Sequence, residues 1–373
     1  MKKLFIITGE YSGDKHAAGI AKKIFAENPD VSIEAVGGSN LEAAGVKLFC
    51  NHEKMSAMGL SLKIILNHIM LGKKVSDYLI KEYKPDLVLL IDYGGFNLNI
   101  AKVLKKAGLK IFYYIPPQIW ASRKWRINTV KKYIDKVITI FPFEKSMYEE
   151  YGIDAEFAGH PLVNQLPTPA NKNEFFAKYN LDTNKKLVSI FPGSRIFEIK
   201  NLLKIFLKSA KLIEKAVPDT QFVICQAPSI KDNQLPQGLI DTSSIKIIKN
   251  ENYNLLALSD ALILASGTVA LEAALYDTPM IISYKGPELF YLIYLLVRCI
   301  KRVSLPNIIT DKDIVPELVQ HKAKPEIIAK HITELLTNKE SYKKMKDELS
   351  NVKKYLTDKN SAEEAAKIII ENL

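Results

Sequence analysis

The chain has 373 residues, of which 47% are hydrophobic and 25% are charged. Its length is two to three times the roughly 150 residues of a usual domain, and its composition is that of a globular protein with a large core. A disordered chain, a collagen-like fibre and a disulfide-stapled miniprotein are excluded. The three cysteines form no CxxC pair, so we expect no structural zinc site and a reducing, cytoplasmic compartment.

The net charge is +11, and residues 61–150 carry 16 basic against 8 acidic residues. A basic balance suits nucleic acid, anionic lipid or a phosphorylated substrate. Nucleic acid is not expected, because the sequence has no basic tail, zinc-finger spacing or RNP-like aromatic motif. No apolar stretch reaches the ~20 residues that span a bilayer, and the apolar run after Met1 is too short for a secretory signal.

The first half of the chain alternates short apolar runs with amphipathic segments. Strands are expected at residues 4–8, 32–36, 86–91, 110–115 and 136–141, and helices at 14–26 and 96–107. This alternation predicts a doubly wound parallel sheet.

The pattern breaks at residues 161–175, where three prolines and the run Asn171-Lys-Asn indicate a linker. It then restarts. Strands are expected at 187–191, 220–225, 245–248, 261–265 and 280–284, and helices at 197–216, from 268 and from about 325. The fold class is therefore α/β, with two Rossmann-like doubly wound domains facing a cleft. We place the first domain at residues 1–165, the second at 166–340, and helices that pack across domains or subunits at 341–373.

The first chemical motif, GEYSGD at residues 9–14, lies where the first strand becomes a helix. Its glycines permit close backbone approach to a ligand, and a helix N-terminus offers free N–H groups. Ser12 and Asp14 would serve equally well as helix N-caps, so the motif alone leaves both interpretations open. It is not a GxGxxG fingerprint, which disfavours a dinucleotide cofactor.

Two similar turns follow strands of the second domain. FPGSR at 191–195 combines a Gly-Ser turn with a fixed cation, a pattern suited to a diphosphate. In SGTVALE at 266–272, two hydroxyls flank a glycine, and Glu272 lies one helical turn after Thr268, where it could accept hydrogen bonds from a ribose. Two such turns in one domain predict nucleotide-diphosphate binding and favour a nucleotide-sugar transferase of the two-Rossmann GT-B architecture.

Eight motifs, in order, resemble the lipid-A-disaccharide synthase family over nearly the whole chain. They are GEYSGD (9–14), IDYGGFN (91–97), PPQIWASR (116–123), FPFE (141–144), FAGHPLV (157–163), FPGSR (191–195), SGTVALEAAL (266–275) and SLPNII (304–309). The resemblance implies an inverting, metal-free and cofactor-free glycosyltransferase. It would condense UDP-2,3-diacylglucosamine with 2,3-diacylglucosamine 1-phosphate to give the β-1,6-linked disaccharide 1-phosphate of lipid A biosynthesis and UDP.

The matched positions imply two groups of binding residues. The UDP donor would be held by Ser194, Arg195, Ser266, Gly267, Thr268, Glu272 and Asn307. The acceptor side would be lined by Ser12, Gly13, Asn97, Gln118, Trp120 and Arg123.

The general base is less well defined by the resemblance. Many family members carry a second acid in the first-domain motif, and here Gly95 replaces it. Asp92, at the end of a strand, is our first choice, with a helix cap as its alternative role. Asp14, Glu10 and His16 remain open as bases.

Membrane contact is predicted from two apolar segments that also carry basic residues, 60–74 and 288–302. Buried core helices would look similar, but a diacylated substrate favours peripheral binding to the inner face of the inner membrane. A homodimer is left open.

Other UDP-sugar enzymes are the main alternatives, namely a lipid-linked N-acetylglucosaminyltransferase or a UDP-N-acetylglucosamine 2-epimerase. Their donor halves would look alike, but GEYSGD and PPQIWASR favour the synthase. A membrane-surface protein without catalysis is a further alternative, supported only by Gly95.

Overall fold

A computed structural model describes residues 1–51, 62–236, 238, 240, 245–288, 291, 295, 299–357 and 359–373, without the side chains of 62–67. The chain divides into two compact units. Unit 1 comprises residues 1–164 and 356–373, and unit 2 comprises residues 165–355. Each has its own parallel sheet, which confirms the prediction of two doubly wound α/β units.

Unit 1 is built on a seven-stranded sheet in the order β3-β2-β1-β4-β5-β6-β7. The strands are β1 (Lys3–Ile7), β2 (Ser32–Gly37), β3 (Lys47–Asn51), β4 (Leu87–Ile91), β5 (Ile111–Tyr114), β6 (Lys136–Thr139) and β7 (Ala155–Phe157). All five residues of β4, LVLLI, are buried, as expected for a parallel strand covered on both faces. The order reverses between β1 and β4, so ligand-binding loops are expected at their carboxyl ends.

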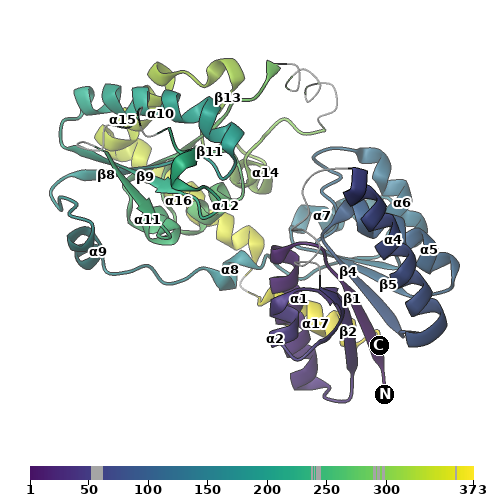
Figure 1. Ribbon diagram of the computed structural model, residues 1–373. Helices are drawn as coiled ribbons and strands as arrows, with labels where there is room; N and C mark the ends of the chain where they lie inside the picture. The colour runs from purple at the N-terminus through teal and green to yellow at the C-terminus, as the bar shows by residue number, and fades with distance from the viewer. Residues whose placement is uncertain are drawn as a thin grey trace. The chain divides into compact units, whose positions relative to one another are not determined.

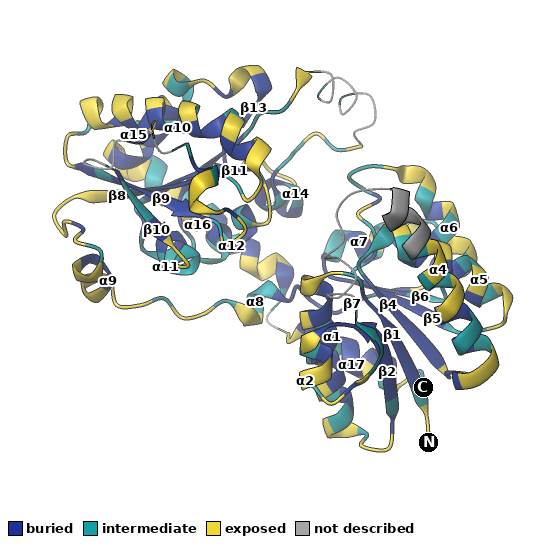
Figure 2. Ribbon diagram, viewed as in Figure 1, coloured by how far each residue is buried: buried dark blue, intermediate teal, exposed yellow. Residues whose placement is uncertain are grey.

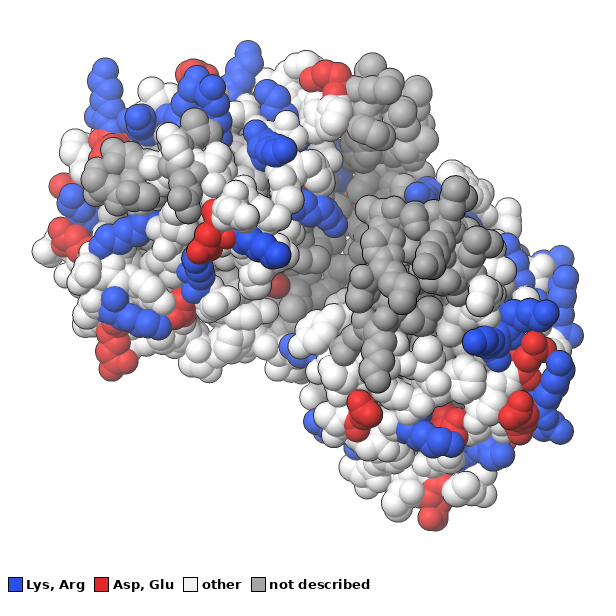
Figure 3. Space-filling view, viewed as in Figure 1, with Lys and Arg blue, Asp and Glu red and all other residues white. Residues whose placement is uncertain are grey.

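Helices cover both faces of this sheet, with α1, α2 and α17 on one face and α4, α5 and α6 on the other (Figure 1). They are α1 (Tyr11–Glu27), α2 (Ser39–Ala43), α4 (Leu62–Tyr78) with its π-helical end η1 (Leu79–Tyr83), α5 (Gly94–Lys106), η2 (Lys124–Arg126), α6 (Ile127–Tyr133), α7 (Pro142–Glu150), α8 (Leu162–Gln165) and α17 (Ser361–Ile370). Lysines of α5 and α6 give that side of the unit a concentration of positive charge (Figure 3).

The last helix, α17, completes unit 1 although unit 2 separates it from the rest of the unit in sequence. It packs along α1, where Gly19 faces Ala362. Its first residue, Ser361, donates to the carbonyl of Gly159 (2.7 Å) and is hydrogen-bonded to the hydroxyl of Tyr114 (2.8 Å). These contacts hold α17 on the sheet.

Unit 2 has a six-stranded sheet in the order β10-β9-β8-β11-β12-β13. The strands are β8 (Lys186–Phe191), β9 (Thr220–Gln226), β10 (Ile245–Lys249), β11 (Ala261–Ala265), β12 (Met280–Tyr284) and β13 (Glu317–Val319). The order reverses between β8 and β11, the two strands that precede the FPGSR and SGTVALE motifs.

The helices of unit 2 include a long amphipathic one, α10, whose apolar side packs with α15 on one face of the sheet (Figure 2). They are α9 (Lys172–Lys178), α10 (Ile196–Ala216), η3 (Asp232–Gln234), α11 (Asn252–Leu258), α12 (Val269–Leu275), α14 (Leu305–Thr310), η5 (Gln320–Lys322), α15 (Pro325–Thr337) and α16 (Lys339–Leu356). Part of the predicted linker, 161–175, is helical, because Asn171 caps α9 by accepting hydrogen bonds from Asn173 and Glu174. Among the described helices, none is both long and apolar enough to cross a membrane.

Candidate functional site

In unit 2, the two predicted phosphate-type turns meet in one cavity of about 400 Å³. The cavity lies at the carboxyl ends of β8 and β11, where the strand order reverses. It brings together six of the seven predicted donor residues, namely Ser194, Arg195, Ser266, Gly267, Thr268 and Glu272. The structure adds lining residues to which the sequence analysis gave no role, among them Glu198, Cys225 and Asn252.

Glu198 shapes the first of the two turns. Its Oε2 accepts the backbone N–H of Ser194 (2.9 Å) and of Arg195 (3.2 Å), and its Oε1 lies 3.1 Å from Nη1 of Arg195. The two N–H groups expected to face a diphosphate are therefore occupied by this carboxylate. Glu198 occupies the N3 position of α10, where the acid of a capping box lies, but the N-cap is Arg195 and not the serine or threonine of that pattern, so the sequence did not single it out.

Two glycines of this cavity differ in what they require. Gly193 has φ +116°, and a Cβ there would lie 2.4 Å from Oε2 of Glu198, so the fold itself demands glycine. At Gly267 a Cβ would meet nothing within 4 Å. No contact in the described part of the chain explains Gly267, whereas close approach of a ligand would.

Arg195 and Glu272 provide the charged side chains of the cavity. The side chain of Arg195 is 71% exposed, although its guanidinium contacts Glu198. Burial raises the pKa of the Glu272 carboxyl. Burial, with a smaller contribution from the charge of Glu272, also raises the pKa values of Cys225 and Tyr253 nearby. A cation beside a turn and a half-buried acid deeper in the cavity suit a ligand with a phosphate end and a hydroxyl-bearing end.

Asn307 is not in this cavity. Its amide donates to the carbonyl of Val315 (2.9 Å) and to Glu317 (2.9 Å), and its Oδ1 accepts the N–H of Val315 (3.0 Å). It is 1% exposed. The side chain predicted to contact the donor is thus used to fix the loop between α14 and β13.

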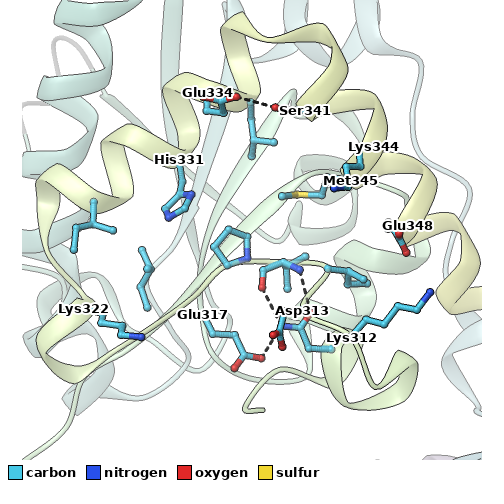
Figure 4. A pocket seen from close by; sticks show the side chains of 17 residues that line it. Lys312, Asp313, Glu317, Lys322, His331, Glu334, Ser341, Lys344, Met345 and Glu348 are labelled. Atoms are coloured by element: carbon cyan, nitrogen blue, oxygen red, sulfur yellow. Dashed lines mark hydrogen bonds between the residues drawn. The ribbon is translucent and has the colours of Figure 1, made fainter. Parts of the chain in front are cut away.

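Asn307 borders instead a second cavity of unit 2, of about 940 Å³, beside β13, α15 and α16 (Figure 4). Ser341 of α16 donates to Glu334 of α15 (2.7 Å) at its edge. Its charged side chains are mixed in sign and include Lys312, Asp313, Glu317, Lys322, Glu334, Lys344 and Glu348. This lining shows no preference for an anion.

In unit 1, the motif residues follow β1, β4, β5 and β6, which are neighbours in the sheet and end at the same edge. The helix after β1 begins earlier than predicted, because Glu10 is its N-cap and Tyr11 its first residue. Ser12, Gly13 and Asp14 therefore lie inside the first turns of α1, and neither Ser12 nor Asp14 is the N-cap. Glu10 and Ser12 are exposed.

Asp14 is fully buried, and both of its carboxylate oxygens accept hydrogen bonds. Its Oδ1 accepts the N–H of Gly38 (2.6 Å), and its Oδ2 accepts the N–H and the side-chain amide of Asn40 (2.8 and 2.9 Å). It holds the start of α2 against α1. Because its oxygens face these donors, Asp14 is placed for structure and not for proton transfer to a substrate.

Asp92 is held differently. It is half-buried, has φ +47°, and burial raises the pKa of its carboxyl above the usual range. Its backbone carbonyl accepts hydrogen bonds from Asn97 Nδ2 (2.8 Å) and from the hydroxyl of Tyr113 (2.7 Å). The next residue, Tyr93, is the N-cap position of α5, so Asp92 is not a helix cap. Asn97 is fully buried and acts as a brace for Asp92.

The segment after β5 contains Gln118 and Arg123, which are exposed, and Trp120, which is anchored. Trp120 Nε1 donates to Oε1 of Glu144 (2.8 Å), and its ring meets that of Phe143 edge-on at 5.2 Å. Glu144 is 1% exposed, and burial raises its pKa to about 7. Glu144 belongs to the FPFE motif, but the sequence gave no indication of its partner.

Two of the histidines of this unit, His16 and His160, lie in or near the sequence motifs. Burial lowers the pKa of His16 to about 4 and that of His160 to about 3, so both are neutral at neutral pH. The His160 ring packs 5.0 Å from that of Phe141, and its Nδ1 accepts the N–H of Leu162 (3.2 Å). Among the described residues, no group of three or more histidines, cysteines and acids is arranged to hold a metal ion.

Comparison with known proteins identifies the family. The model of the family described as lipid-A-disaccharide synthetase matches residues 4–370. The chain belongs to the lipid-A-disaccharide synthase family. It is 37% identical to such a synthase of Coxiella burnetii over 99% of this chain and 98% of that one. It is 35% identical to one of Syntrophus aciditrophicus over 98% and 96%, respectively.

The family resemblance predicted from the eight motifs is thereby confirmed: the chain is a glycosyltransferase of lipid A biosynthesis. Solved structures with the same fold include a UDP-GlcNAc 2-epimerase of Neisseria meningitidis (TM-score 0.63, 15% identity, 100% of this chain and 99% of that one). Another is S. aureus MnaA with UDP (TM-score 0.69, 15% identity, 100% and 98%). At this identity they support the GT-B-like fold alone, and the family match sets the epimerase alternative aside.

Proposed function

We propose that the protein transfers diacylglucosamine from UDP-2,3-diacylglucosamine to 2,3-diacylglucosamine 1-phosphate, with inversion at the anomeric carbon. The products would be the β-1,6-linked disaccharide 1-phosphate and UDP. The observation that carries this proposal is the cavity that joins the FPGSR and SGTVALE turns in unit 2. Membership of the synthase family supports the choice of lipid substrates.

In the proposed donor site, Arg195 meets the diphosphate and Glu272 accepts hydrogen bonds from the ribose hydroxyls. The exposed guanidinium is free to turn toward phosphate oxygens on its unoccupied side. Ser194, Ser266 and Thr268 supply hydroxyl donors around the same cavity. Gly267 lets the phosphates approach the backbone closely.

In the proposed reaction, Asp92 is the general base. Its carboxylate takes the proton of the acceptor 6-hydroxyl as that oxygen attacks the anomeric carbon. The bond from this carbon to the UDP oxygen breaks, its electron pair passes to the diphosphate, and Arg195 stabilises the developing charge. Attack opposite the leaving group inverts the configuration.

Asp92 is preferred to the other acids for a structural reason. Asp14 has its oxygens committed to Gly38 and Asn40, whereas no hydrogen bond from another residue's side chain to the Asp92 carboxylate is found among the described residues. The raised pKa makes Asp92 a stronger base than an exposed aspartate. For His16, burial acts in the opposite direction and lowers the pKa to about 4.

Peripheral binding to the inner face of the inner membrane is also proposed. Ile69 and Met70 of α4 are 64% and 55% exposed and belong to the apolar, basic segment 60–74. Residues 60 and 61, the side chains of 62–67 and more than half of 288–302 fall outside the described residues. Apolar side chains with nearby lysines suit an anionic lipid surface.

The test is UDP release from UDP-2,3-diacylglucosamine in detergent micelles, with and without 2,3-diacylglucosamine 1-phosphate. Acceptor-dependent release, with a β-1,6-linked disaccharide 1-phosphate as product, is expected. UDP binding without any acceptor-dependent release would contradict the proposed reaction. Release with a product of retained anomeric configuration would contradict the inverting mechanism.

A further inference from the structure

An apolar groove of about 810 Å³ lies between α4 and α5 in unit 1. This volume falls in the range of roughly 300–1,000 Å³ that is typical of small-molecule sites. Its apolar walls consist of Ile69, Ile80, Tyr93, Phe96, Ile100 and Val103. Gly72 and Gly95 also line it, and a Cβ at Gly95 would meet nothing within 4 Å.

Large apolar side chains are exposed along this groove. Ile69 is 64% and Val103 is 48% exposed, on opposite walls, and Met70 is 55% exposed beside the groove without lining it. Exposed apolar surface of this kind is unfavourable in water and marks a binding site for an apolar partner.

One end of the groove reaches the strand end that carries Asp92. Tyr93 lines the groove, and its hydroxyl is hydrogen-bonded to His68 of α4. Its ring packs 5.5 Å from that of Phe96, and a Cβ at Gly9 would lie 2.3 Å from its Cδ1. The ring therefore stands between the loop after β1 and the groove, so a ligand bound beside Asp92 has its apolar part next to the groove.

The charge of the lining suits an anionic lipid. Asp77 forms an ion pair with Lys81 (2.9 Å), which leaves Lys73 as the cation of the described lining. A lipid that carries a phosphate and long acyl chains matches both the charge and the apolar walls.

We propose that this groove binds one acyl chain of the acceptor lipid. The identity of that lipid rests on the function proposed above. An acyl chain held between two helices is shielded from water on both sides. Binding in the groove should therefore depend on acyl-chain length more strongly than contact with a flat membrane surface would. Gly95 leaves open the end of the groove nearest Asp92.

The first experiment compares acceptors whose acyl chains differ by about four methylenes. Each accommodated methylene should raise kcat/KM about fourfold. In Gly72→Leu the added side chain fills the groove; its Cβ would lie 3.6 Å from Phe96, an ordinary contact, and leucine is a better helix former than glycine. Val103→Glu places a charge in the lining at an exposed position. Both variants should lose at least tenfold of the long-chain preference, measured as the ratio of kcat/KM for the long-chain and the short-chain acceptor.

Met70→Ser is the matched control, because it removes exposed apolar surface from the same helix without touching the groove. It should keep the wild-type chain preference. A preference unchanged in both Gly72→Leu and Val103→Glu, each shown to be folded by thermal unfolding, would overturn the proposal. An equal loss in Met70→Ser would also overturn it, in favour of a membrane contact.

The second experiment detects binding without turnover. A 2,3-diacylglucosamine 1-phosphate with a photoreactive diazirine at the end of one chain should label α4 or α5, and Gly72→Leu should lose this label. Label on these helices with no UDP release would support the groove and contradict the proposed function. UDP release with label only on other parts of the chain would support the proposed function and contradict the proposed acyl-chain groove.

Discussion

The two units use the same edge of the same kind of sheet for opposite purposes. In unit 2, Glu198 holds one turn from within, and Arg195 and Glu272 are left to line a polar cavity. In unit 1, Asp14 and Asn97 form hydrogen bonds with backbone groups and so stabilise the fold. The groove between α4 and α5 in that unit is apolar. The comparison teaches that a motif at a strand end marks where a ligand binds, whereas the contacts decide which of its residues are free to bind it.

The largest expected effect comes from Asp92→Asn. Loss of a general base should lower kcat by about 10²- to 10⁴-fold, because the acceptor hydroxyl then keeps its proton. UDP affinity, measured by calorimetry, should be unchanged, since the proposed donor cavity lies in unit 2. In the wild type, the acid limb of the activity profile should lie above the usual aspartate range.

Glu10→Gln is the control for this change. It removes an exposed acid from the same sheet edge and should leave turnover close to wild type. Normal turnover in Asp92→Asn would exclude Asp92 as the general base. A large loss of turnover in Glu10→Gln would indicate that Glu10 is the base instead.

Glu144→Gln tests the buried side of unit 1. The folded-state pKa of Glu144, about 7, lies above the ordinary value of 4.5, so the unfolded chain loses this proton first. Glu144 therefore lowers stability progressively as pH rises from 4.5 to 7, by on the order of 3 kcal/mol when complete. Glutamine removes this penalty, so the stability gain of the variant should grow across that window.

The measurement is denaturant unfolding at several pH values, with wild type and variant compared at each. His16 and His160 act in the opposite direction, since their lowered pKa values cost stability as pH falls below 6.5, but they are common to both proteins. A stability difference that does not vary between pH 4.5 and 7 would show that the Glu144 pKa is not raised.

In unit 2, Arg195→Ala and Glu272→Ala should each weaken UDP binding about tenfold, which corresponds to one charge-assisted hydrogen bond. Lys200→Ala, which removes an exposed cation from the same helix, is the control and should bind UDP normally. Unchanged UDP affinity in both test variants would place the donor outside this cavity.

The last prediction separates the two glycines of the unit 2 cavity. Gly193→Ala should lower the free energy of unfolding by about 1 to 3 kcal/mol, because alanine is strained at φ +116° and meets Glu198. Gly267→Ala should leave stability unchanged and weaken UDP binding, because only a ligand needs that space. If Gly267→Ala binds UDP as well as wild type, the proposed close approach of the phosphates is wrong.

Much of the fold could be predicted because long apolar runs and helical periodicity are local signals. β1, β4, β8 and β11 were expected within a residue or two, and their order places the motifs at one edge. The short strands β3, β7 and β13 were missed. Strands of three to five residues depend on pairing with neighbours, which no local pattern reveals.

The candidate site was predictable by position but not by role. The partners of Asp14 are 24 and 26 residues away, and the partner of Trp120 is 24 residues away, so no spacing rule finds them. Asn307 belongs to a motif of the family, yet its side chain contacts Val315 and Glu317 across the loop between α14 and β13. The motif alone does not reveal these contacts. Glu198 is close to its partners Ser194 and Arg195 in sequence, but with arginine at the N-cap it does not complete the serine- or threonine-based capping-box pattern.

The packing of α17 against α1 has a consequence for synthesis. Domains generally fold as they emerge from the ribosome, N-terminal first. Here the face of α1 that receives α17 stays uncovered until all of unit 2 has been translated. The unit that is made first is therefore completed last, and during that interval the apolar surface that α17 will cover is exposed to solvent.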